Sequence, residues 1–222
     1  MPSNLIVSPS LLSADPTKFG EEVLLVRELG AKWLHFDIMD GHFVPNISFG
    51  PFVVKALSNY GLYNDVHLMV TDPLKYAPRF IEAGANLITF HYEAVNQIIP
   101  TCQKILEMTK RKIDLGLSIK PRTQIENILP FVNFFNTILI MSVEPGFSGQ
   151  SFIPSSLEKI KTLRKYIDDN HLSTLIEVDG GVNDTNVLDV KNAGADVIVS
   201  GSYLFKARNK KEAMDLLLKW KG

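Results

Sequence analysis

The feature that most constrains the fold is a regular alternation of short apolar runs with longer amphipathic segments. We predict strands over residues 5–12, 33–39, 65–70, 87–91, 114–119, 137–143, 175–179 and 197–200. Helical patterns lie between them, among them 16–29, 73–82, 95–109, 155–168 and 185–193. Because a helical crossover returns the chain in the same direction, such strands pair in parallel.

Local signals support these helices. Gly30, Gly84 and Gly194 each follow a helical pattern, where glycine suits a left-handed C-cap. We predict Ser155 and Asn183 as N-caps, with Glu158 as the acid of a capping box after Ser155.

Eight strand–helix units are the number that closes a (β/α)8 TIM barrel. The alternative is an open doubly wound sheet, which usually has a glycine-rich turn after its first strand. Here that turn reads SLLSAD over residues 10–15, without glycine. The chain has 222 residues, with no linker and no shift in composition. We therefore predict one α/β domain, a (β/α)8 barrel over residues 1–222.

Composition excludes several classes of protein. The formal net charge is −1 and the charges are scattered, so we expect no nucleic-acid partner. No apolar run approaches the roughly 20 residues that span a bilayer, and no signal peptide is recognised, so we expect a cytoplasmic protein that does not bind membranes. Cys102 lies in a helical pattern and is interpreted as a reduced structural thiol.

Residues of the types that bind divalent metals lie near the ends of three predicted strands. His35 and Asp37 are two residues apart in one strand, so their side chains point to the same side. His67 and Asp179 lie in two other strands. Burying such groups is costly without compensation, and the carboxyl ends of barrel strands meet at one axis. We therefore predict a site for a borderline divalent ion such as zinc, manganese, iron(II) or cobalt.

The other histidines do not fit this pattern as well. His42, His91 and His171 are interpreted as structural or surface residues, although His91 also ends a predicted strand.

Glycine-rich segments follow the last three predicted strands. They read VEPGFSGQ over 143–150, VDGG over 178–181 and SGS over 200–202, and none contains Lys or Arg. Glycine lets backbone N–H groups approach an anion closely, and the loops after strands seven and eight are the usual phosphate site of such barrels. We predict that amides and hydroxyls, notably those of Ser148 and Ser202, bind a phosphate group.

Six runs together carry a resemblance to a known family. They are SPSLLSAD at 8–15, HFDIMDGHFVPN at 35–46, HLMV at 67–70, VEPGF at 143–147, VDGG at 178–181 and SGS at 200–202. In this order they resemble the ribulose-phosphate 3-epimerase family, over essentially the whole chain. The resemblance implies a metal-dependent barrel enzyme of the pentose phosphate pathway, which interconverts D-ribulose 5-phosphate and D-xylulose 5-phosphate, and a homo-oligomer. Many relatives have glycine where Ser148 stands.

The resemblance also implies roles for individual residues. One divalent ion per subunit, expected to be zinc, is held by His35, Asp37, His67 and Asp179, and Asp37 and Asp179 form the acid/base pair. The substrate-binding residues are Ser10 and His67, which contact the sugar, and Gly146, Phe147, Ser148, Gly149, Gly180, Gly181, Gly201 and Ser202, which surround the phosphate.

Two carboxyl groups suit epimerisation at C3. The reaction removes a proton beside the C2 ketone and returns one on the opposite face, so it needs a proton carrier on each side of a planar enediolate. Met39, Met69 and Met141 are either core residues or an apolar wall around this intermediate.

Three alternatives differ in substrate or in chemistry. A six-carbon ketose-phosphate epimerase, such as allulose 6-phosphate 3-epimerase, would use the same residues. A non-catalytic sugar-phosphate sensor would have little use for paired carboxylates beside a metal. A decarboxylase of the orotidine-phosphate type needs a lysine where this chain has Met39.

Overall fold

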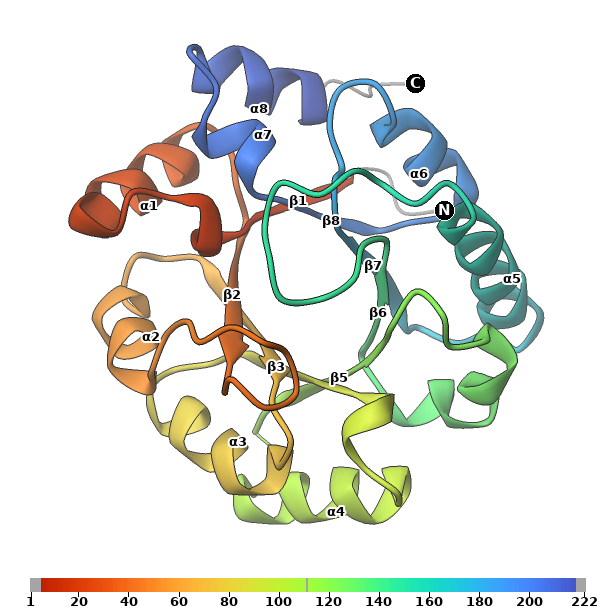
Figure 1. Cartoon of the computed structure of the whole chain (residues 1–222). Coiled ribbons are helices and arrows are strands. Elements are labelled where there is room, and N and C mark those ends of the chain that lie inside the picture. The colour runs from red at the N-terminus through yellow and green to blue at the C-terminus, as the bar shows by residue number, and fades with distance from the viewer. Residues whose placement is uncertain (1–4, 111, 219–222) are drawn as a thin grey trace.

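The computed structural model describes residues 5–110 and 112–218, and in these residues eight parallel strands form one curved sheet. They are β1 Ile6–Pro9, β2 Trp33–Met39, β3 Tyr63–Met69, β4 Leu87–His91, β5 Asp114–Ile119, β6 Thr137–Met141, β7 Leu175–Asp179 and β8 Val197–Ser200. The order is β1-β8-β7-β6-β5-β4-β3-β2, and an isolated parallel bridge between Ser10 and His35 joins the two ends. Figure 1 shows the strands around a common centre with the helices outside. The predicted (β/α)8 barrel is confirmed.

Helices connect the strands along the described chain. They are α1 Phe19–Glu28, α2 Pro51–Leu57, α3 Pro73–Glu82, α4 Ile98–Met108, α5 Ser156–Asp169, α6 Val187–Ala193, α7 Ser202–Phe205 and α8 Lys210–Leu218. The described chain also contains short 3₁₀ helices, which are η1 Leu11–Ser13, η2 Pro16–Lys18, η3 Tyr92–Ala94, η4 Ile125–Asn127 and η5 Leu129–Phe134. The crossover after β5 therefore consists of η4 and η5. In residues 5–110 and 112–218, no helix combines the length and the apolar character needed to cross a bilayer.

The helix ends follow ordinary capping chemistry. Asp72 caps α3 by accepting a hydrogen bond from the backbone N–H of Lys75, and Pro73 occupies the first turn. The three predicted cap glycines have positive φ angles, of 107° at Gly30, 103° at Gly84 and 115° at Gly194. These values lie in the left-handed region, where a side chain would strain the backbone.

The predicted capping box at α5 is wrong. Ser155 already has a helical backbone, with φ −65° and ψ −14°, because the preceding turn winds directly into the helix, and its side chain caps nothing. Glu158 instead pairs with Lys161 at 2.8 Å. Asn183 accepts hydrogen bonds from Thr185 in the turn before α6, rather than at the first turn of that helix.

The predicted strands at 5–12 and 137–143 are too long. β1 ends at Pro9 and β6 ends at Met141, because in each case the chain leaves the sheet for an irregular connection or a 3₁₀ turn. Apolar runs alone do not mark this departure, since residues such as Leu11 and Val143 are buried beyond the strand ends.

Alternation along the strands divides the core into two parts. In β2, Leu34, Phe36 and Ile38 pack in the main core between sheet and helices, so His35 and Asp37 face the barrel interior. At the amino-terminal end of the strands, Trp33, Leu87 and Val197 fill the interior.

Beyond this apolar layer the interior becomes polar. Ser8, His35, Asp65, Thr89 and Glu177 are all fully buried there. Because every strand runs in the same direction, its carboxyl end carries polar side chains toward one mouth of the barrel.

The helix shell should account for much of the stability. Phe80 on α3 is 1% exposed, and Phe52 on α2 is 76% exposed. We expect Phe80→Ala to lower the free energy of unfolding by about 3–5 kcal/mol, because it leaves a cavity, and Phe52→Ala to change it by less than about 0.5 kcal/mol. Equilibrium denaturation measures both, and similar losses for the two variants would contradict this packing.

Candidate active site

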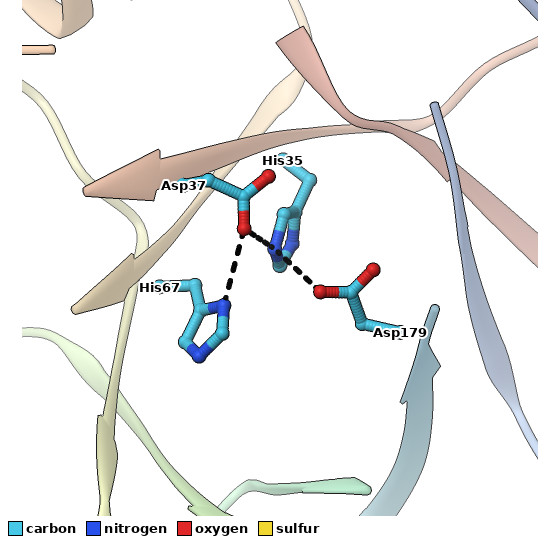
Figure 2. A group of neighbouring side chains, drawn as sticks. All are labelled: His35, Asp37, His67 and Asp179. Atoms are coloured by element: carbon cyan, nitrogen blue, oxygen red, sulfur yellow. Dashed lines mark hydrogen bonds and ion pairs between the residues drawn. The ribbon is translucent and has the colours of Figure 1, made fainter. Parts of the chain in front are cut away.

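The fold brings His35, Asp37, His67 and Asp179 together at the carboxyl ends of β2, β3 and β7. One ligand atom from each lies within 4.8 Å of the others. Oδ1 of Asp37 is 3.4 Å from Nε2 of His35 and 3.3 Å from Nδ1 of His67, and Oδ2 of Asp179 is 4.0 Å from Nε2 of His35. Figure 2 shows the side chains converging from three strands.

His35 is held so that one ring nitrogen faces this cluster. Its Nδ1 lies 2.5 Å from Oδ2 of Asp65, while its buried Nε2 has no hydrogen-bond partner within residues 5–110 and 112–218. Burial by itself lowers the pKa of His35, but the charges of Asp65 and Asp37 outweigh burial and raise the pKa well above its ordinary value. The pocket therefore favours a positive charge at Nε2, whether a proton or a metal cation.

The two cluster carboxyl groups differ in acidity. Burial raises the pKa of Asp37, but the His35 and His67 rings overcome this effect and lower the pKa well below its ordinary value. Burial, together with the charge of Asp37, raises the pKa of Asp179 to about 7. The hydroxyl of Ser10 donates to Oδ2 of Asp37 at 2.6 Å. One carboxyl group is thus anionic near neutral pH, while the other can hold a proton.

His67 continues into a row of buried polar groups. Its Nε2 is 2.8 Å from Nε2 of His91, and Nδ1 of His91 is 3.2 Å from Oε2 of Glu93. Burial is the main reason that the pKa of His91 falls to about 4. His91, for which the sequence pattern indicates a structural or surface role, is fully buried and contacts a predicted metal ligand.

Two further acids beneath the cluster were not predicted. Asp65 precedes His67 by two residues, and Glu177 precedes Asp179 by two, so each shares a side of its strand with a predicted ligand. The same spacing argument that linked His35 to Asp37 could have found both. Burial and the charge of Asp65 raise the pKa of Glu177 well above its ordinary value.

The donor set fits a divalent metal ion. It combines two imidazole nitrogens and two carboxylate oxygens, and among the described residues one of the nitrogens has no hydrogen-bond partner. Such mixed nitrogen and oxygen ligands suit borderline ions, and the excess of acids over bases favours a cation. The described residues therefore form a cluster that could hold a metal.

A cavity of about 520 Å³ opens above this cluster, with Asp37 and Asp179 in its wall. Of the residues predicted to contact substrate, nine line it: Ser10, Gly146, Phe147, Ser148, Gly149, Gly180, Gly181, Gly201 and Ser202. The tenth, His67, is fully buried and does not form part of the wall. Met39, Met69 and Met141 also line the cavity. No Lys or Arg is among the described residues that surround it.

Close approach between the loops explains two of the glycines. Gly181 has φ +67°, and a Cβ there would lie 2.5 Å from the backbone nitrogen of Phe152. A Cβ at Gly201 would lie 2.7 Å from Oγ of Ser13. Gly181 is therefore required for the loops to meet, because its contacts are backbone atoms, whereas a side chain at residue 201 would require the Ser13 hydroxyl to move.

Polar residues beyond the predicted set also surround the cavity. Ser13, Gln150 and Asn183 are part of its wall. The amide of Gln150 donates to the carbonyls of Glu144 and Phe147, at 2.7 and 2.8 Å, and so shapes the loop after β6. In Figure 1 this loop lies over the centre of the barrel. The sequence offered no periodic signal for these loop contacts.

Comparisons with known proteins identify the family of the chain. The chain matches the model of the ribulose-phosphate 3 epimerase family over residues 6–205. It is 44% identical over 217 residues to ribulose-phosphate 3-epimerase from Synechocystis, covering 96% of this chain and 93% of that protein. The same enzyme from Escherichia coli is 42% identical over 212 residues, with coverages of 95% and 93%.

A solved structure supports the fold alone. The crystal structure of 3-keto-L-gulonate-6-phosphate decarboxylase from Vibrio cholerae matches with a TM-score of 0.71 at 13% identity, covering 96% of this chain and 95% of that one. The family match and the sequence identities above show the family as well as the fold, because they span nearly the whole chain. The chain therefore belongs to the ribulose-phosphate 3 epimerase family, and it is an epimerase.

Proposed function

We propose that this enzyme interconverts D-ribulose 5-phosphate and D-xylulose 5-phosphate by exchanging the C3 proton with Asp37 and Asp179. The observation that carries the proposal is the pair itself. Two carboxyl groups from β2 and β7 line one cavity, and both belong to the cluster with His35 and His67. The relatives named ribulose-phosphate 3-epimerase support the choice of substrate.

The two acids divide the proton transfer between them. Removal of the C3 proton leaves a planar enediolate, and inversion requires that the new proton arrive from the other face. Asp37 and Asp179 enter from different strands (Figure 2), so each can serve one face. A pair of carboxyl groups suits this task, because one can take the proton from one face while the other returns a proton to the opposite face.

The neighbouring residues support this chemistry. Ser10 keeps Asp37 in place through its hydrogen bond. The sulfur-containing side chains of Met39, Met69 and Met141 are almost fully buried at the cavity wall, where they exclude water from the reacting carbon. Exclusion of water strengthens the electrostatic interactions within the site.

We assign zinc to the cluster, held by His35, Asp37, His67 and Asp179. When bound, the ion would supply positive charge near the oxygens of the enediolate, where negative charge develops. His35 and Asp65 prepare for this charge, since the hydrogen bond at Nδ1 leaves Nε2 turned toward the cluster.

The phosphate group is assigned to the glycine-rich loops after β6, β7 and β8. It would be held by backbone N–H groups near Gly180, Gly181 and Gly201 and by the hydroxyls of Ser148 and Ser202, without help from a cationic side chain.

A role in the pentose phosphate pathway, a cytoplasmic location and a homo-oligomeric state stay predictions.

Substitution of either acid tests the catalytic pair. We expect Asp37→Asn and Asp179→Asn each to lower turnover by about 10²–10⁴-fold, the usual effect of removing a positioned acid or base. Asp169→Asn removes an exposed acid of α5 that pairs with Lys165, and it should leave turnover unchanged. A coupled assay of xylulose 5-phosphate formation measures all three, and near-normal turnover of either active-site variant would remove that residue from the pair.

Isotope exchange separates the roles of the two acids. In heavy water, the wild-type enzyme should place deuterium at C3 of both epimers. Each Asn variant should exchange the C3 proton of only the epimer whose proton faces the remaining carboxylate. Proton NMR of the recovered sugars follows this exchange. Loss of exchange in both epimers for both variants would argue against a separate base for each face.

Turnover of sugars with five and six carbons tests the length of the substrate. We expect turnover of ribulose 5-phosphate to exceed that of the six-carbon allulose 6-phosphate, measured at equal concentrations with the same protein. A higher turnover of the six-carbon sugar would assign the enzyme to that substrate instead. Exchange with neither sugar would favour a sensor that does not catalyse.

Metal binding is expected to stabilise the fold. Chelation should abolish turnover, and added zinc should restore it. At a free zinc concentration about 100 times Kd, the free energy of unfolding should rise by about 2.7 kcal/mol. Denaturation with and without zinc measures this gain, and His35→Gln should reduce it. An equal gain in the variant would place the ion elsewhere.

A further inference from the structure

A row of hydrogen bonds leads from His67 away from the cavity to the loop after β4. It passes from Nε2 of His67 to Nε2 of His91 at 2.8 Å, and from Nδ1 of His91 to Oε2 of Glu93 at 3.2 Å. Neither His91 nor Glu93 lines the cavity. From this geometry we propose that His91 and Glu93 are positioning residues, which fix the orientation and protonation of His67 so that its Nδ1 is free to bind the metal. This inference rests on the metal site of the proposed function.

The positions of the protons follow from chemistry. A nitrogen that binds a metal carries no proton, so a metal-binding Nδ1 leaves the proton of a neutral His67 on Nε2. That N–H can donate only to an unprotonated nitrogen of His91, which places the proton of His91 on Nδ1. There it donates to the Glu93 carboxylate. One arrangement of protons satisfies every contact in the row.

The far end of the row is anchored by the loop after β5. Oε1 of Glu93 accepts the backbone N–H of Lys120 at 2.8 Å and also accepts the hydroxyl of Thr123. The ammonium group of Lys159 donates to the carbonyls of Pro121 and Thr123, at 2.5 and 2.6 Å. The Glu93 carboxylate is thus held by a braced loop, and it can determine where the His91 ring lies.

Ring packing restricts the row further. The ring of Phe43 lies with its centroid 4.8 Å from that of His91, and the ammonium group of Lys120 is 4.0 Å from the Phe43 centroid. His91 is fully buried, so water does not compete for its nitrogens. A carboxylate acting through His91 makes His67 a stronger donor to a cation, and partners of this kind commonly change metal affinity by about 10–100-fold.

The test compares metal affinity among full-length variants. Zinc dissociation constants are measured by competition with a chromophoric chelator, and the visible absorption of the cobalt(II) form reports ligand geometry. We expect His91→Phe, which keeps a ring but removes the acceptor, to weaken zinc binding by about 10–100-fold and to change the cobalt spectrum. His91→Gln retains an acceptor oxygen and should recover most of the affinity. Glu93→Gln should bind zinc with an affinity between that of His91→Phe and that of the wild type.

Matched controls remove the same groups elsewhere. Glu158→Gln removes an exposed acid of α5, and His171→Gln changes an exposed histidine after that helix; both should bind zinc as the wild type does. Thermal unfolding of the metal-free proteins checks that each variant folds. If His91→Phe does not fold, Glu93→Gln decides alone.

The outcomes separate the two proposals. The inference would be overturned, and the metal site left intact, if folded His91→Phe bound zinc with wild-type affinity and had an unchanged cobalt spectrum. If His91→Phe does not fold, the same result in Glu93→Gln would overturn it. A wild-type protein that binds zinc tightly but does not epimerise ribulose 5-phosphate would overturn the proposed function, and the variants would still test the inference. A wild-type protein that binds no zinc or cobalt would overturn the inference and the assigned metal site.

Discussion

Charged groups buried inside the barrel are the constraint on which the rest of the structure depends. Isolated acids and imidazoles in such a place are costly to bury, and several of them are compensated by a neighbour. His35 is paired with Asp65, and Asp37 with Ser10 and His67. Among the described residues, neither oxygen of Glu177 has a hydrogen-bond partner, and its raised pKa favours the neutral acid. Nε2 of His35 faces the cluster acids, and in the proposed function a cation would lie beside it.

The strands and the mouth of the barrel were predictable because they follow from periodicity. Short continuous runs of apolar residues mark buried strands, and the parallel order follows from the helices between them. The convergence of His35, Asp37, His67 and Asp179 then required only that carboxyl ends of barrel strands meet. Five of the eight predicted strands have the observed bounds, while β1, β3 and β6 differ at their ends.

Contacts that depend on loop paths or on strand register were harder to predict from the sequence. The link between His67 and His91 requires the register of β3 against β4, in which His67 pairs with Thr89. The sequence shows no such register, so His91 looked like any histidine at a strand end. The wrong capping box at Ser155 has a similar origin, because the turn before α5 sets the backbone of that residue. Asp65 and Glu177, by contrast, could have been predicted, because each lies two residues before a predicted ligand in the same strand.

The composition of the cavity wall affects how it can attract an anion. The described residues around the cavity include no Lys or Arg, and the wall at Gly181, Gly201 and Ser202 offers backbone and hydroxyl donors whose charge does not change with pH. Fixed cationic side chains attract anions over long distances and lose this attraction as ionic strength rises. In the proposed function, this part of the wall would bind the phosphate group through short-range dipoles instead. Its affinity would then vary little with salt concentration, and binding would depend on the fit of the loops rather than on the overall field of the protein.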